Sequence, residues 1–409
     1  MNKFLKEFKD RGFFYQCTSE NELSRLLDNE RISGYIGFDC TAESLHVGSL
    51  LQIMCLRLLQ KHGHRPIVLL GGGTTRIGDP SGKDKTRTIL NEEEIEKNIK
   101  NIEKILKNFL DIDDPQTKPI FVNNYSWLKN LNYISFLRDI GKHFTINKML
   151  SFDSVKTRLD REQSLSYMEF NYMILQAYDF FELNKKENCV LQMGGSDQWG
   201  NIVNGVDLIK RHSNKQAYGL TTPLITLASG AKMGKTESGA VWLDKKFLSP
   251  YDYWQFWRNI DDRDVLKFLK IFTDLDVEEI ENVRDKNINE LKIILANEAT
   301  AMLHGKKEAN ASEETAKKTF TENSLGAELP SVLITKNQLD KGLNIIDLII
   351  LSKLENSKSE IRRLIKGNGV KINNKSIDDE KLIITKNLFK ANIVRLSLGK
   401  KRHIKVQLS

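Results

Sequence analysis

Acidic side chains lie in the loops after three apolar stretches that are predicted to be buried strands. These acids are Asp39, Asp79 and Asp197, and a glycine lies one or two residues before each of them. Continuous apolar runs such as 66–70 are typical of strands buried on both faces of a parallel sheet. Ligands of such sheets bind beyond the carboxyl ends of the strands. We therefore expect the three carboxylates at one edge of one sheet, around one site.

The segment 35–49 combines a strand, a polar loop and the start of a helix. His46 and Ser49 are three residues apart at the helix start, so they lie on the same side of its first turn. A helix N-terminus offers unpaired N–H groups and the positive end of the helix dipole, which favour phosphate. Gly48 has no side chain, so a flat ligand such as a purine can lie on the backbone there. The alternative is that this segment is an ordinary strand–loop–helix connection without a ligand, and that its histidine lies at the surface.

The segment 167–179 is strongly helical. Tyr172, Gln176 and Asp179 lie at i, i+4 and i+7, so their polar groups share one face. If this helix packs on the sheet, the row needs a polar ligand to satisfy it. The alternative is that these three polar side chains face the solvent and bind no ligand.

The segment 229–239 is a glycine-rich loop that carries Lys232, Lys235 and Thr236. Two lysines three residues apart and a hydroxyl suit a mobile clamp on phosphate oxygens. Lysines are common in surface loops, so this signal is weak when it is taken alone.

Length and composition indicate a multidomain soluble protein. The chain has 409 residues, 40% of them hydrophobic and 28% charged, and no apolar run near its start is long enough for a signal peptide or a membrane span. The four cysteines form no C-x-x-C pair, so neither disulfides nor a zinc site is predicted. We expect a cytoplasmic enzyme without a membrane contact.

The positive charge is concentrated at the C-terminal end. Residues 343–409 contain 15 Lys and Arg against 6 Asp and Glu, so the rest of the chain has a net charge of −1 within a total of +8. A predicted helix at 357–367 faces outward with Lys358, Arg362, Arg363 and Lys366. This basic face suits the phosphate backbone of structured RNA.

The pattern of elements predicts an α/β fold with a doubly wound parallel sheet, followed by an all-α domain and a small α+β module. The expected boundaries are a catalytic domain at 1–226 with an insertion at 125–165, the lysine loop and connector at 227–249, a helical domain at 250–322, a linker at 323–342 and the basic module at 343–409.

Six segments in this order resemble the bacterial-type tyrosyl-tRNA synthetases, a family of class I aminoacyl-tRNA synthetases, over essentially the whole chain. They are 35–49, 78–83, 172–179, 194–201, 232–236 and the basic terminal module, which is similar to an S4 RNA-binding domain. The resemblance implies a Rossmann-like catalytic domain, a helical tRNA-recognition domain and a homodimer formed through the insertion. It implies activation of L-tyrosine by ATP to tyrosyl-adenylate and pyrophosphate, followed by transfer of tyrosine to the 3′ end of tRNA(Tyr).

The resemblance also assigns roles to residues. The tyrosine phenol is expected at Tyr35 and Asp179, and the ammonium at Asp79, Tyr172 and Gln176. Thr41 and His46 are expected at the ATP phosphates, Gly48 under the adenine and Asp197 at the ribose, with Gly37, Asp39, Ser49, Gly195 and Gln198 as further ATP-binding residues. Lys83, Arg87, Lys232, Lys235 and Thr236 are expected to bind the leaving pyrophosphate, and Lys358, Arg362, Arg363 and Lys366 to bind tRNA. Magnesium is expected with ATP, without a dedicated set of protein ligands or an organic cofactor.

The chain departs from the family pattern at Ser49, where the family usually has a second histidine. The shorter hydroxyl puts the ribose or adenine contact in question. The lysine loop reads Lys-Met-Gly-Lys-Thr at 232–236, which resembles a variant common in bacterial tyrosyl enzymes. A tryptophanyl-type class I synthetase should lack the pair Tyr35 and Asp179, and an RNA-binding or splicing protein derived from a synthetase should have damaged phosphate-binding residues.

Overall fold

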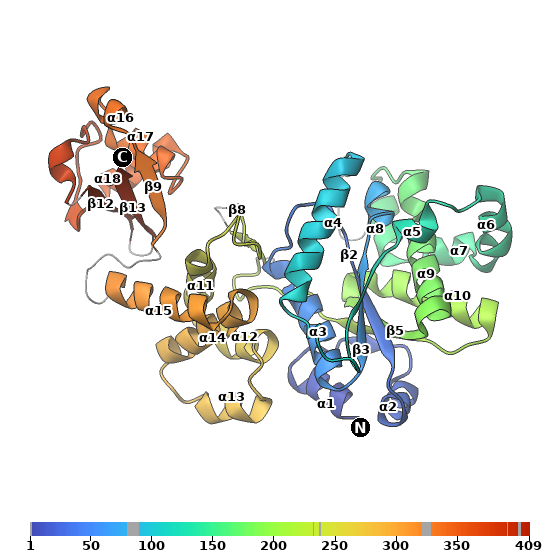
Figure 1. The fold of residues 1–409 in the computed structure, drawn as a ribbon. Helices are drawn as coiled ribbons and strands as arrows, with labels where there is room; N and C mark the ends of the chain where they lie inside the picture. Colours follow the sequence, from blue (N-terminus) through green and yellow to red (C-terminus); the bar gives the residue numbers. More distant parts are fainter. Residues whose placement is uncertain are drawn as a thin grey trace. The chain divides into compact units, whose positions relative to one another are not determined.

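The computed structural model of the chain forms two compact units, residues 1–248 with 256–303 and residues 249–255 with 304–409. Figure 1 shows the helices and strands of both units. The structure describes residues 2–79, 90–231, 233–236, 239–320, 329–390, 392–399 and 402–409, without the side chains of residues 153, 154, 235, 236 and 320. None of the helices within these ranges is both long enough and apolar enough to cross a membrane.

The first unit is built on a six-stranded sheet in the order β1-β6-β5-β2-β3-β4. All neighbouring strands are parallel except the short edge strand β1. The bounds are β1 Gln16–Cys17, β2 Ser33–Phe38, β3 Arg65–Leu70, β4 Ile120–Asn123, β5 Cys189–Gly195 and β6 Tyr218–Thr222. The predicted α/β class with a doubly wound parallel sheet is confirmed.

Helices cover both faces of this sheet. Figure 1 shows α3 (Leu50–Lys61) and α4 (Glu92–Lys107) on one side, and α9 (Tyr167–Glu187) and α10 (Trp199–Ser213) on the other. Nine of the twelve residues of α3 are buried, as expected for a helix that is apolar nearly all round. The N-terminal helices are α1 (Lys3–Asp10) and α2 (Glu20–Asn29).

Four short helices lie between β4 and α9. They are α5 (Tyr125–Leu128), α6 (Tyr133–Asp139), α7 (Ile146–Leu150) and α8 (Asp153–Asp160). A buried ion pair joins α8 to the first turn of α9, because Arg158 Nη1 lies 3.1 Å from Glu169 Oε1 and both side chains are less than a tenth exposed. Glu169 also completes a capping box with Ser166. The insertion therefore fixes the start of the helix that carries the predicted polar row.

The helical region follows the sheet in the chain. It comprises α11 (Pro250–Arg258), which crosses the boundary between the two units, α12 (Val265–Phe272), α13 (Val277–Val283), α14 (Ile288–His304) and α15 (Lys306–Phe320). Within the first unit, Trp257, Phe268 and Phe272 pack ring against ring with centroids 5.1 to 6.1 Å apart. The predicted domain division stays a prediction.

The second unit contains a five-stranded sheet in the order β11-β10-β12-β13-β9. Its elements are β9 (Ser331–Ile334), α16 (Lys336–Asp340), α17 (Ile345–Leu351), α18 (Lys358–Lys366), β10 (Val370–Ile372), β11 (Lys375–Ser376), β12 (Ile393–Leu398) and β13 (Arg402–Leu408). The region 323–342, predicted as a linker, differs from that expectation in its second half. Here β9 pairs with β13 as a parallel strand, and α16 follows it.

Candidate active site

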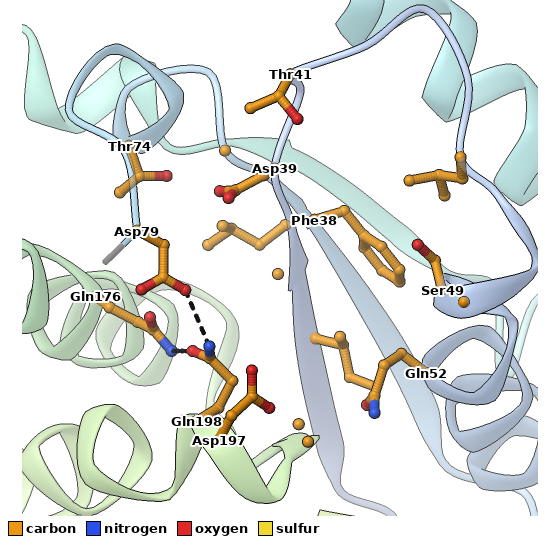
Figure 2. A pocket seen from close by; sticks show the side chains of 18 of the residues that line it. Phe38, Asp39, Thr41, Ser49, Gln52, Thr74, Asp79, Gln176, Asp197 and Gln198 are labelled. Carbon is orange, nitrogen blue, oxygen red and sulfur yellow. Dashed lines mark hydrogen bonds between the residues drawn. The ribbon is translucent and has the colours of Figure 1, made fainter. Parts of the chain in front are cut away.

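A cavity of about 550 Å³ lies at the carboxyl ends of β2, β3 and β5, between the start of α3 and the middle of α9. Figure 2 shows its lining side chains pointing inward from these elements. Asp39, Asp79 and Asp197 all line it, as does the polar row of α9 formed by Tyr172, Gln176 and Asp179. Segments that are more than 100 residues apart in the chain therefore meet because parallel strands end at one edge of the sheet.

Tyr35 and Asp179 form a deeply buried part of the cavity, and each side chain is 1% exposed. Asp179 accepts hydrogen bonds from Asn124 Nδ2 at 2.9 Å and Trp127 Nε1 at 2.7 Å. Burial outweighs these two bonds and raises the pKa of Asp179 to about 7. The Tyr35 hydroxyl has no hydrogen-bond partner among the described residues. Burial and the nearby Asp179 carboxyl raise the pKa of Tyr35, so this hydroxyl remains protonated and is a donor.

Amide side chains link the acid Asp79 to the row on α9. Gln198 Nε2 donates to Asp79 Oδ2 at 2.9 Å, and Gln176 Nε2 donates to Gln198 Oε1 at 3.3 Å (Figure 2). Asn201 Nδ2 donates to both glutamine carbonyls at 3.1 Å. The Tyr172 hydroxyl donates to Asp39 Oδ1 at 3.4 Å, so it bridges α9 and the end of β2. The arrangement collects negative charge and carbonyl oxygens, which suits a cationic group.

The glycine-rich side of the cavity contains His46, Gly48 and Ser49. The backbone N–H of Gly48 donates to His46 Nδ1 at 3.0 Å. A Cβ atom at Gly48 would lie 2.6 Å from the imidazole and 3.0 Å from the Met233 carbonyl, so only glycine fits. Ser49 begins α3 without capping it through its side chain and lines the cavity with Gly37, Thr41, Gly195 and Asp197.

The sequence prediction missed Gln52, which lies one turn beyond Ser49 and also lines the cavity. Its Nε2 donates to Thr222 Oγ1 at 2.9 Å, and Thr222 Oγ1 in turn donates to Gly194 O at 3.5 Å. This relay leaves Gln52 Oε1, which is buried without a partner among the described residues, as an acceptor. The i, i+3 spacing from Ser49 is the signal that identifies it.

The lysine loop packs on the 35–49 segment where it is described. Gly234 has a φ of +97°, and a Cβ there would lie 2.8 Å from His46 Nδ1. Val47 N donates to Val241 O, and Leu243 N donates to Leu45 O, both at 2.9 Å. The hairpin of β7 (Lys235–Thr236) and β8 (Gly239–Ala240) precedes these contacts. Lys83, Arg87 and Lys232 lie outside the described residues, and the side chains of Lys235 and Thr236 are not described.

The predicted RNA-binding residues form the outer face of α18 in the second unit. Lys358, Arg362, Arg363 and Lys366 are exposed, whereas Ile361 and Ile365 are buried in the core of the module. Three of the four basic side chains have an acidic neighbour: Lys358 lies 3.9 Å from Asp347, Arg362 3.5 Å from Glu380 and Arg363 2.7 Å from Glu360. Such exposed pairs are weak and exchange readily for another anion.

A family model described as tRNA synthetases class I (W and Y) matches residues 27–321. The chain therefore belongs to the class I tRNA synthetases for tryptophan and tyrosine. This match spans the sheet except its edge strand β1, together with the cavity and the helices α11 to α15.

Full-length relatives narrow the family further. The chain is 81% identical to a tyrosine–tRNA ligase of Pelagibacter ubique over 408 residues, which cover 100% of both chains. It is 50% identical to a tyrosine–tRNA ligase of Rickettsia massiliae over 410 residues, with 99% of this chain and 100% of the other covered. A C-terminally truncated mitochondrial tyrosyl-tRNA synthetase of Aspergillus nidulans has a TM-score of 0.69 and 31% identity, covering 78% of this chain and 94% of that one. Within its family the chain is thus a bacterial-type tyrosine–tRNA ligase, which confirms the predicted family and enzyme class.

Proposed function

We propose that the cavity binds L-tyrosine and ATP, forms tyrosyl-adenylate with release of pyrophosphate, and then delivers tyrosine to the 3′ end of tRNA(Tyr). The observation that carries this proposal is the pair Tyr35 and Asp179. A buried hydroxyl donor without a partner and a buried carboxylate need a ligand group that both accepts and donates a hydrogen bond. A phenol does both, phenylalanine does neither, and the indole N–H of tryptophan only donates.

The amide network supports the ammonium site of tyrosine. Asp79 provides a carboxylate, and Gln176 and Tyr172 lie on the same side of α9 as Asp179. An ammonium group has three donors and no acceptor, so it matches oxygen atoms from these side chains. We propose that Asp79, Tyr172 and Gln176 bind this group while Tyr35 and Asp179 bind the phenol.

The other side of the cavity is proposed to bind ATP. The bond from Gly48 N requires His46 Nδ1 to be unprotonated, so the proton of the neutral ring lies on Nε2 and is a donor for a phosphate oxygen. Gly37, Gly48 and Gly195 let the nucleotide approach the backbone, and Asp197, an exposed acid on the cavity rim, is the acceptor proposed for ribose hydroxyls. We assign Thr41 to the phosphates with His46, and Asp39, Ser49 and Gln198 to further ATP contacts.

The chemistry proposed needs no general base, because the attacking group of tyrosine is already a carboxylate. The chain's contribution is to align this carboxylate with the α-phosphorus and to stabilise negative charge on the phosphates. Lys83, Arg87, Lys232, Lys235 and Thr236 are proposed to bind the leaving pyrophosphate. Magnesium is proposed to arrive with the ATP phosphates, whose oxygen atoms are the kind of ligand it prefers.

Assembly and RNA binding complete the proposal. The insertion exposes Tyr133, Ile134, Ile146 and Leu159, and the first residue of α9 after it, Tyr167, is also exposed. Each is 48% to 71% exposed, which supports a homodimer formed there. The outer face of α18 is proposed to bind the phosphate backbone of tRNA(Tyr). We propose a cytoplasmic location, where these substrates are found.

The test is ATP–pyrophosphate exchange by the purified full-length protein with tyrosine, phenylalanine or tryptophan as the only amino acid. We expect exchange with tyrosine alone and its loss in Asp179→Ala, while a matched exposed control, Asp113→Ala, keeps it. Exchange with tryptophan instead would favour the tryptophanyl alternative. No exchange by a folded protein that still binds RNA would favour the RNA-binding alternative and refute the proposal.

A further inference from the structure

A series of aromatic rings leads from the cavity to the protein surface. The ring centroids of His46 and Trp242 are 6.3 Å apart, and those of Trp242 and Phe247 are 6.0 Å apart at an interplanar angle of 50°. Trp242 lines the cavity. Phe247 does not, and it is 43% exposed. A large apolar side chain is therefore displayed beside the entrance, next to the histidine of the 35–49 segment.

Hydrogen bonds fix the turn that displays Phe247. Asp244 Oδ1 accepts from Lys246 N at 2.9 Å, and Asp244 O accepts from Phe247 N at 3.0 Å. Asp244 N donates to Ser44 Oγ at 3.1 Å, which ties the turn to the loop of the 35–49 segment. The ring of Phe247 is thus presented in a defined position relative to the cavity, at little cost in conformational entropy on binding.

Lysine side chains lie near this ring and near its acidic neighbour Glu43. Lys246 Nζ lies 5.3 Å from the centroid of Phe247 and 3.4 Å from Glu43 Oε2. Lys97 lies 2.7 Å from the other oxygen of Glu43, and Lys245 is exposed in the same turn. Two of these lysines therefore share the Glu43 carboxylate and the third is exposed in the turn, so a polyanion is attracted to the place where the aromatic face is exposed.

We propose that Trp242 and Phe247 form a stacking platform for the single-stranded 3′ end of tRNA, with Lys245 and Lys246 facing its phosphates. Aromatic faces combined with lysines are the chemistry with which proteins bind single strands independently of sequence. This inference rests on the proposed function, because a strand that receives tyrosine must pass the entrance at which Trp242 and Phe247 lie. A protein partner would not need the cations, and a duplex has no exposed base faces to stack.

The test compares Phe247→Ala and Phe247→Tyr with the wild-type full-length protein. Phe247→Ala is expected to lower kcat/KM for tRNA(Tyr) in aminoacylation roughly tenfold, as for the loss of one stacked base. Phe247→Tyr keeps the aromatic face and should remain near wild type. ATP–pyrophosphate exchange without RNA should be unchanged in both. Ile112→Ala, an exposed apolar residue that does not line the cavity, is the matched control and should change neither activity.

A second measurement uses tRNA(Tyr) from which the single-stranded 3′ nucleotides have been removed, as a competitive inhibitor. Phe247→Ala should weaken the binding of intact tRNA but leave the inhibition constant of the trimmed tRNA unchanged. Three results would refute the platform. They are a kcat/KM for tRNA(Tyr) in Phe247→Ala equal to that of wild type, a parallel fall in ATP–pyrophosphate exchange, or an equal weakening of the binding of trimmed tRNA. Failure of wild-type exchange with tyrosine would instead refute the proposed function on which the platform rests.

Discussion

Asp179→Asn removes a charge from a buried part of the cavity with almost no change of size. The carboxyl is 1% exposed, and burial raises its pKa from 3.8 to about 7 despite the hydrogen bonds from Asn124 and Trp127. The same charge that we propose for binding the tyrosine hydroxyl therefore opposes folding of the empty enzyme. Stability and activity should respond to this substitution in opposite directions.

The stability effect follows from the direction of the pKa change. Because the folded protein binds this proton more tightly than the unfolded chain, the contribution of Asp179 to stability is fully present below about pH 4 and is lost as the pH rises to about 7. With 1.36 kcal/mol for each pKa unit, the buried charge costs up to about 4 kcal/mol above pH 7. Asparagine loses one acceptor toward Asn124 or Trp127, which costs about 1–3 kcal/mol. We expect the variant to be about 2 kcal/mol more stable than wild type at pH 8.5 and nearly equal at pH 5.5.

The activity effect has the opposite sign. A hydrogen bond to a charged group contributes about 1.5–3 kcal/mol, so kcat/KM for tyrosine should fall about 10- to 150-fold in Asp179→Asn at pH 8. In the wild type, kcat/KM reports the ionisation of the free enzyme and should fall about tenfold per pH unit below pH 7. The variant should lack this dependence, and KM for ATP should be unchanged in both.

ATP–pyrophosphate exchange between pH 5.5 and 8.5 and thermal unfolding at the two ends of that range measure these effects. Parallel pH profiles of kcat/KM for wild type and variant would show that Asp179 is not the titrating group. A variant that is less stable than wild type at pH 8.5 would show that the buried carboxylate does not oppose folding. Either result refutes the reasoning.

Four further predictions concern other parts of the chain. Tyr35→Phe should lower the preference for tyrosine over phenylalanine about tenfold in exchange without lowering the thermal midpoint, because its hydroxyl has no partner in the empty cavity. Arg158→Met should destabilise the folded protein by about 3 kcal/mol in denaturant unfolding, since it leaves the buried Glu169 carboxylate without its cation; an unchanged midpoint would contradict this. Ile134→Glu should yield monomers in light scattering at concentrations at which we expect the wild type to be a dimer, and a wild-type mass for the variant would exclude this face. Arg363→Ala should raise KM for tRNA(Tyr) and reduce its salt dependence while exchange stays constant; equal salt slopes would argue against a phosphate contact.

Much of the sheet is predictable from the sequence, because buried parallel strands leave continuous apolar runs and end in glycines. The positions of Asp39, Asp79 and Asp197 around one cavity follow from that pattern alone. The edge strands of the sheet are not predictable in this way. β1 has only two residues and β4 is half-buried throughout, so neither has the apolar run of a central strand.

The partners of the cavity residues are harder to predict than the residues themselves. Asn124 and Trp127 hold Asp179 from the start of the insertion, more than 50 residues away, and their pattern gives no sign of that contact. Trp242 reaches His46 only because the chain after the lysine loop pairs with the 35–49 segment. Such contacts depend on the tertiary arrangement of distant elements, which local periodicity does not encode.

The helix α9 connects the insertion to the cavity as a single rigid rod. Its first turn is held by Arg158 through Glu169, and Asp179 lies ten residues, or about 15 Å, further along the axis. A tilt of about 4° at the first turn would displace Asp179 by about 1 Å, a misplacement that can cost about 100-fold in rate. A small change in the angle at which the insertion holds the first turn of α9 thus becomes a displacement of the Asp179 carboxylate. The precision with which the insertion fixes this angle therefore sets the precision with which the carboxylate is placed.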